Sequence, residues 1–143
     1  MSEAPPPRSN PALAPTFATA TYLASVIALW GFTSLITDRD VIDYPDAGPL
    51  VGPAMAATAC VVVFLLSLRA RITPPALLAL ITGVLAYLGA IVVGAIGYSL
   101  QLDTFSVFLP ALVHFGIGPF MLGAGILAGL VVGGTAWLVR PRG

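Results

Sequence analysis

Four aspartates within nine positions form the densest group of chemically active side chains in this sequence: Asp38, Asp40, Asp43 and Asp46. Carboxylate oxygens are the ligands that hard cations such as calcium prefer, so the segment is a candidate metal site. Its spacing does not match the calcium loop in which Asp or Asn recurs at alternate positions before a glycine and a distant glutamate. A hydrated acidic turn is therefore the favoured interpretation, and a docking surface for a partner is the other alternative.

The single histidine and the single cysteine are the other residues that could do chemistry. We expect His114 near the outer surface, where with Asp103 and the acidic segment it could hold a transition metal or sense pH. The favoured interpretation is an interfacial histidine satisfied by a carbonyl or water. Cys60 lies among alanines and is interpreted as a small packing residue. One cysteine excludes an internal disulfide, and we expect no metal and no cofactor.

The composition excludes a soluble enzyme and a nucleic-acid-binding protein. Hydrophobic residues make up 58% of the 143 positions and charged residues 8%, whereas about 25% of a soluble domain is charged. Six basic and six acidic residues leave no net charge, so no basic field attracts nucleic acid. Because no acid, base or nucleophile pair can be assembled among the apolar residues, we expect the protein not to be an enzyme.

Four apolar runs are long enough to cross a bilayer as helices, because about 20 helical residues span its hydrocarbon core. The predicted spans are residues 16–37, 49–68, 74–100 and 119–139. Together they form a membrane domain over residues 16–139. A Pro-rich tail over residues 1–15 precedes it and is expected to be disordered, and a short C-terminus over residues 140–143 follows it.

The last apolar stretch, residues 104–139, is too long for one straight span. Gly116, Gly118 and Pro119 predict a break, because proline suits the first turn of a helix. Residues 104–115 would then form a short interfacial or re-entrant segment, which is tolerated in a bilayer only where protein buries its backbone. A single kinked helix that begins near Pro110 is the alternative.

The arginines predict the orientation of the spans. Only Arg39 falls on the side that carries all five aspartates, and the other arginines share the opposite side: Arg8, Arg69, Arg71, Arg140 and Arg142. The positive-inside rule then places both termini in the cytoplasm of a bacterium. The predicted fold is an all-α, antiparallel four-helix transmembrane bundle in the plasma membrane, N-in/C-in, with a broken segment before the last span.

Small residues recur at four-residue spacing within the spans, which lets helix backbones approach closely in lipid. The ladders selected for helix packing are Ala86, Ala90 and Gly94 in the third span and Gly125, Gly129 and Gly133 in the fourth. The glycine ladder predicts either packing inside the bundle or a docking face for another subunit.

Residues 41–55, VIDYPDAGPLVGPAM, resemble a segment of small uncharacterised four-span membrane proteins of actinobacteria. The arginine-only, alanine-rich composition is compatible with a GC-rich genome. In length and span number the chain is also similar to the small fourth subunit of actinobacterial cytochrome oxidase, with no shared motif. These resemblances imply a membrane protein and bring no known activity.

The absence of Asp, Glu, Lys and Arg from the four spans disfavours an ion-coupled transporter, since intramembrane charges usually mark such pathways. The favoured hypothesis is an accessory or structural subunit without a catalytic site. Its partners would be the lipid bilayer and a larger membrane protein or a second copy, with no nucleic acid. The alternative is a self-assembling channel or small-solute carrier lined by Ser, Thr and Tyr.

Overall fold

The computed structural model describes residues 12–38 and 48–140, and within these ranges the chain is helical without strands. Four helices within these ranges are long and apolar enough to cross a membrane. This length and composition are typical of a membrane protein. In chain order the elements are α1 (Leu13–Thr37), α2 (Gly48–Ser67), α3 (Pro75–Gln101), the 3-10 turn η1 (Phe105–Val107), α4 (Phe108–Ile117) and α5 (Pro119–Val139).

The helix bounds lie close to the predicted spans, and those of α5 coincide with them. The largest difference is at α1, which begins at Leu13 and so includes three residues of the tail that we expected to be disordered. Pro15 falls in the first turn, where no intrahelical partner awaits its missing N–H. The Thr16 hydroxyl also donates to the Ala12 carbonyl at 2.8 Å. Residues 1–11 lie outside the described part of the chain.

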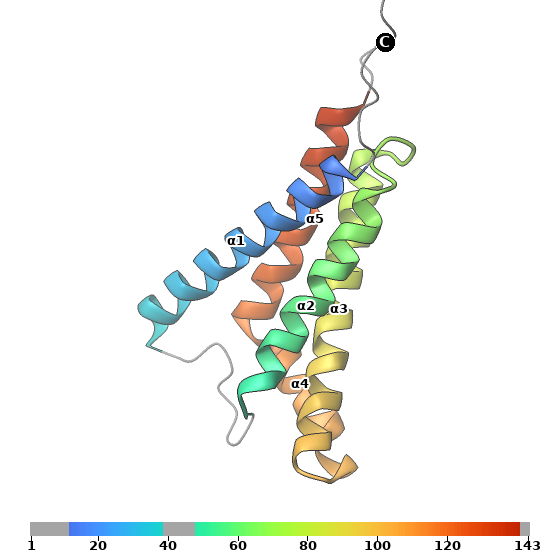
Figure 1. The fold of residues 1–143 in the computed structure, drawn as a ribbon. Coiled ribbons are helices and arrows are strands. Elements are labelled where there is room, and N and C mark those ends of the chain that lie inside the picture. Colours follow the sequence, from blue (N-terminus) through green and yellow to red (C-terminus); the bar gives the residue numbers. More distant parts are fainter. Residues whose placement is uncertain (1–11, 39–47, 141–143) are drawn as a thin grey trace, which may run out of the picture.

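Helix α3 is the centre of the molecule, packed along α2 and along α5 (Figure 1). Successive contacts pair Val51 of α2 with Gly97 of α3 and Thr58 of α2 with Gly89 of α3, so the two helices lie side by side over most of their length. Helix α4 is short and lies beside the second half of α3. The helix is interrupted after α4, and the chain continues as α5 beside the first half of α3.

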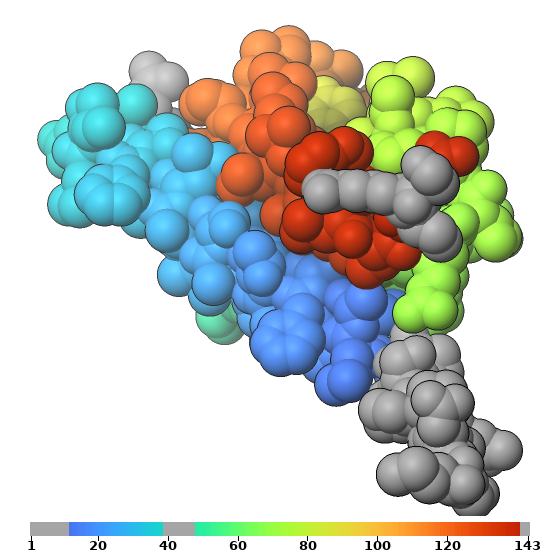
Figure 2. Space-filling view, turned by 90° about the horizontal axis from the view of Figure 1, so that it is seen from above, coloured from blue at the N-terminus to red at the C-terminus, as the bar shows by residue number. Residues whose placement is uncertain are grey.

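Helix α1 packs against α2 and α5 from its start as far as Trp30, which donates a hydrogen bond to the Phe120 carbonyl of α5. Its buried residues end at Val26, while Leu35 and Ile36 near its C-terminal end are each 82% exposed. Viewed from above, the C-terminal end of α1 extends away from the other helices (Figure 2). In a bilayer this end contacts lipid or another protein.

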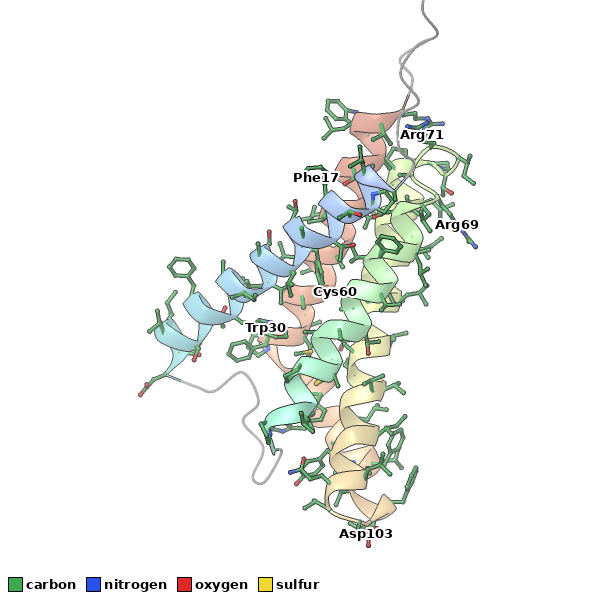
Figure 3. All side chains as sticks on the ribbon, in the orientation of Figure 1. Phe17, Trp30, Cys60, Arg69, Arg71 and Asp103 are labelled. Atoms are coloured by element: carbon green, nitrogen blue, oxygen red, sulfur yellow. The ribbon has the colours of Figure 1, made fainter. Side chains whose placement is uncertain are left out.

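The two ends of the bundle differ in charge. Arg69 and Arg71 lie at one end and Asp103 at the other (Figure 3). We call these the arginine end and the aspartate end. Two clusters of buried side chains fill the interior, one in the half towards each end. Trp30 of α1 packs against both clusters and so connects them.

Candidate functional site

The acidic segment is described only at its first residue. Asp38 ends α1 in the left-handed conformation, with φ 51°, and its side chain is exposed. Asp40, Asp43 and Asp46 lie outside the described residues. Over residues 12–38 and 48–140, no three His, Cys, Asp or Glu side chains are grouped as a metal site would require. The interpretation of this segment as a hydrated turn stays a prediction.

His114 lies on α4 near the middle of the bundle's length. Our expectation that it lies near the outer side of the membrane, within reach of Asp103, is wrong. Residues 112–117 of α4 line the same groove as residues 87–92 of α3, which are the central residues of α3. The reason is that α4 packs along α3 instead of lying flat at the surface. The six helical steps from Phe108 to His114 alone rise by about 9 Å, which separates His114 from Asp103 at the aspartate end.

The break between α4 and α5 falls at Gly118 and Pro119, two of the three residues at which the sequence predicted it, and Gly116 stays within α4. Gly118 is extended, with φ −66° and ψ 138°, a conformation that the following proline favours. Pro119 has no N–H to donate to the Phe115 carbonyl, so the helical hydrogen bonds stop here. The C-terminal end of α4 therefore presents backbone carbonyls that need donors from elsewhere.

Two aromatic side chains supply donors at this break. The Tyr87 hydroxyl of α3 donates to the Gly116 carbonyl at 2.6 Å, and the Trp30 indole Nε1–H of α1 donates to the Phe120 carbonyl at 3.1 Å. Both bonds join residues far apart in the sequence, and neither role was foreseen from the sequence. They fix the break against two other spans.

The glycine ladder of α5 lies in the contact with α3. A Cβ atom at Gly129 would lie 2.7 Å from the Ala79 carbonyl oxygen, and one at Gly133 would lie 2.8 Å from the Ala79 Cβ. One at Gly125 would lie 2.9 Å from the Tyr87 Cβ. These separations are too short for real Cβ contacts, so α3 and α5 approach this closely only because the ladder is glycine.

The small residues of α3 that face α2 make a softer contact. Ala86 and Ala90 are buried, and a Cβ atom at Gly94 would meet the Met55 sulfur at 2.6 Å. A methionine side chain is flexible and can move aside, whereas a backbone carbonyl cannot. The two ladders therefore differ in how firmly the facing helix opposes a larger residue.

Most Thr and Ser hydroxyls of the spans are used inside their own helices. Each donates to the carbonyl four residues earlier, at 2.7–2.9 Å: Thr16, Thr19, Thr37, Thr58, Thr82, Ser99 and Thr135. The Ser67 Oγ is buried without a hydrogen-bond partner among the described residues. Hydroxyls turned to their own backbone do not line a polar path.

Comparison with known proteins gives a family without an assigned activity. The sequence matches a family of unknown function (DUF6121) over residues 7–143. The chain belongs to the DUF6121 family. No curated protein matches it, and no solved structure matches it.

Apolar hollows lie on the described surface of this DUF6121 protein. One groove of about 360 Å³ runs between α3 and α5, and a second of about 350 Å³ runs between α3 and α4. Tyr87 lines both grooves. A partly open hollow of about 10 Å³ between Tyr22, Trp30 and Met55 has room for no more than about one water molecule. The hollows offer hydrocarbon contact and few polar groups.

Proposed function

We propose that this protein is an accessory or structural subunit that packs beside a larger membrane protein. The observation that carries the proposal is the direction of the hydroxyls: those of Thr58, Thr82 and Ser99, like most others in the spans, donate to their own helix backbone. What remains on the outside is apolar helix surface and apolar grooves. Such a surface can pack against the apolar surface of another membrane protein, and we propose no catalytic activity for it.

The channel or carrier is the second candidate, and the broken helix favours it. Interrupted helices at mid-depth form substrate sites in many transporters, where free backbone groups coordinate the substrate. Here Tyr87 and Trp30 hydrogen-bond to carbonyls on the two sides of the break. This use of the carbonyls supports a structural break more than a substrate site.

We infer an antiparallel bundle in the bacterial cell membrane, with the arginine end and both termini in the cytoplasm and with an actinobacterial source. The five-to-one arginine asymmetry supports the orientation. In a Cys60→Ala background, an impermeant thiol reagent should label Asp103→Cys in intact cells and spare Ile72→Cys and Gly143→Cys. The reverse labelling pattern would contradict this orientation.

Gentle extraction tests the accessory role. The tagged full-length chain is released from its native membranes in a mild detergent and purified, and the bound proteins are quantified by mass spectrometry. We expect one larger membrane protein in constant ratio to the chain. A homo-oligomer without another protein would contradict the accessory role. Solute or ion flux through vesicles that hold only this protein would support the carrier instead.

A further inference from the structure

A hydrogen-bonded turn joins α2 to α3 at the arginine end of the bundle (Figure 3). The Arg69 N–H donates to the Leu66 carbonyl at 2.9 Å, which extends the end of α2. The Arg69 carbonyl in turn accepts hydrogen bonds from the N–H groups of Ile72 and Thr73, both at 3.1 Å. Ala70 is buried against the bundle. These contacts hold the backbone of the turn in place, so its outward side chains have a fixed base.

The turn carries two positive charges without a counter-charge from the described part of the chain. Arg69 and Arg71 flank the buried Ala70, and both arginine side chains are exposed. Among residues 12–38 and 48–140, no ion pair or hydrogen bond joins either guanidinium group to another side chain. The carboxylates of these residues lie elsewhere, since Asp38 is at the far end of α1 and Asp103 is at the aspartate end. Both guanidinium groups are therefore available to an anion from outside the chain.

The apolar neighbours of the two arginines favour a lipid as the source of that anion. Leu68 precedes Arg69 and is 53% exposed, and Ile72 follows Arg71 and is 81% exposed. Because α2 and α3 are both long enough to cross a membrane, the turn between them lies where the hydrocarbon core meets the lipid headgroups. At this level an arginine can reach a phosphate while an adjacent apolar side chain contacts acyl chains. A free anion or an acidic protein surface would leave the apolar side chains without such a contact.

We propose that the α2–α3 turn is a binding site for an anionic phospholipid. The lipid phosphate accepts charge-assisted hydrogen bonds from the guanidinium groups of Arg69 and Arg71, whose planar donors match phosphate oxygens. Leu68 and Ile72 contact the acyl chains of the same lipid. A zwitterionic lipid carries its own cation beside the phosphate and is attracted less than a lipid with a net negative charge. The inference goes beyond the accessory role and does not depend on it, because this chain alone supplies the site.

Lipid retention by the purified full-length protein tests this site. The protein in mild detergent is mixed with equal amounts of phosphatidylglycerol, which is anionic, and phosphatidylcholine, which is zwitterionic, with the same acyl chains on both. Native mass spectrometry then identifies the lipids that stay bound. We expect the wild type to retain phosphatidylglycerol in preference to phosphatidylcholine. The double substitution Arg69→Gln and Arg71→Gln should lower this preference about 25-fold, since each basic residue near an anionic lipid contributes about five-fold.

Asp103→Asn is the matched control, because it removes a charge from the turn at the opposite end of the bundle. Asp103 has φ 51°, a conformation that asparagine also adopts, and this variant should keep the lipid preference of the wild type. Equal retention of both lipids by the wild type, an unchanged preference in the double arginine variant, or an equal loss in Asp103→Asn would overturn the inference. If the double variant keeps the lipid preference but loses a protein that co-purifies with the wild type, the turn docks an acidic protein and the inference is likewise wrong.

Discussion

The two halves of the bundle are packed in different ways. Seven of the twelve buried residues in the arginine-end cluster are alanine, and backbones touch there across the Gly129 contact with Ala79. The aspartate-end cluster contains Met55, Phe115, Phe120 and Met121 and includes the broken helix. Long side chains fill the aspartate-end half, whereas in the arginine-end half the helix backbones lie close together and leave little space to fill.

This difference indicates where the bundle is intolerant and where it can adjust. Small side chains leave no freedom to accommodate extra volume, because the facing atoms belong to the backbone. Methionine can change rotamer at small cost and fill an altered space. We therefore expect the arginine-end half to determine stability, while the aspartate-end half tolerates change and carries the exposed surface of α4.

The largest expected effect is at the α3–α5 contact. Gly129→Leu places a side chain where a Cβ already lies 2.7 Å from the Ala79 carbonyl oxygen, so we expect a loss of about 3 kcal/mol, at the upper end of overpacking costs. Thermal unfolding of the purified protein in detergent measures this. Gly134→Leu on the same helix is the matched control, because no atom lies within 4 Å of its Cβ position. Equal unfolding temperatures would show that backbone contact does not control this half.

A smaller effect is expected at the helix break. Tyr87→Phe keeps the ring but removes the 2.6 Å hydrogen bond to the Gly116 carbonyl, which then has no donor from this side chain. Interhelical hydrogen bonds in membranes contribute about 0.6 kcal/mol on average and at most about 1.7. We expect a loss in this range, measured by the same unfolding assay. A variant as stable as the wild type would mean that the break needs no external donor.

The smallest effect is expected at the α2–α3 contact. Gly94→Ala requires only that the Met55 side chain move, and alanine favours a helix over glycine by about 1 kcal/mol. These terms oppose each other, so the net change should lie within about 0.5 kcal/mol of zero. Gly97→Ala is the control, since its Cβ would make an ordinary 3.7 Å contact with Val51 and should stabilise the helix. A strong destabilisation by Gly94→Ala would make the two halves equally rigid.

The sequence could predict the helix bounds and the break because apolar run length and proline position determine both directly. Pro119 opens α5 at the predicted residue. It could not predict the depth of His114, because residues 104–117 are apolar enough either to lie at the surface or to follow α3. Nor could it predict where α1 leaves the bundle, since no charge within α1 marks the point at which its contacts with α2 and α5 end.

The hydrogen-bond acceptors of Tyr87 and Trp30 could not be predicted from the sequence. Each donates to a backbone carbonyl on another helix, 29 and 90 positions away, and every residue has a carbonyl that could serve. The hydrogen-bond partners of the hydroxyls could not be predicted either, because a threonine hydroxyl can donate to a neighbouring helix or to its own backbone. The Ser/Thr/Tyr-lined path therefore stays a hypothesis that rests on composition.

The size at which the chain migrates when native membranes are first solubilised tests the accessory role most directly. Native electrophoresis in a mild detergent, with the chain detected by antibody, needs no tag and no purification. The account predicts that the chain migrates in one larger assembly and is shifted to its own small mass only by harsher detergent. Migration in mild detergent at the 14.7 kDa mass of one chain, or at simple multiples of it, would contradict the account.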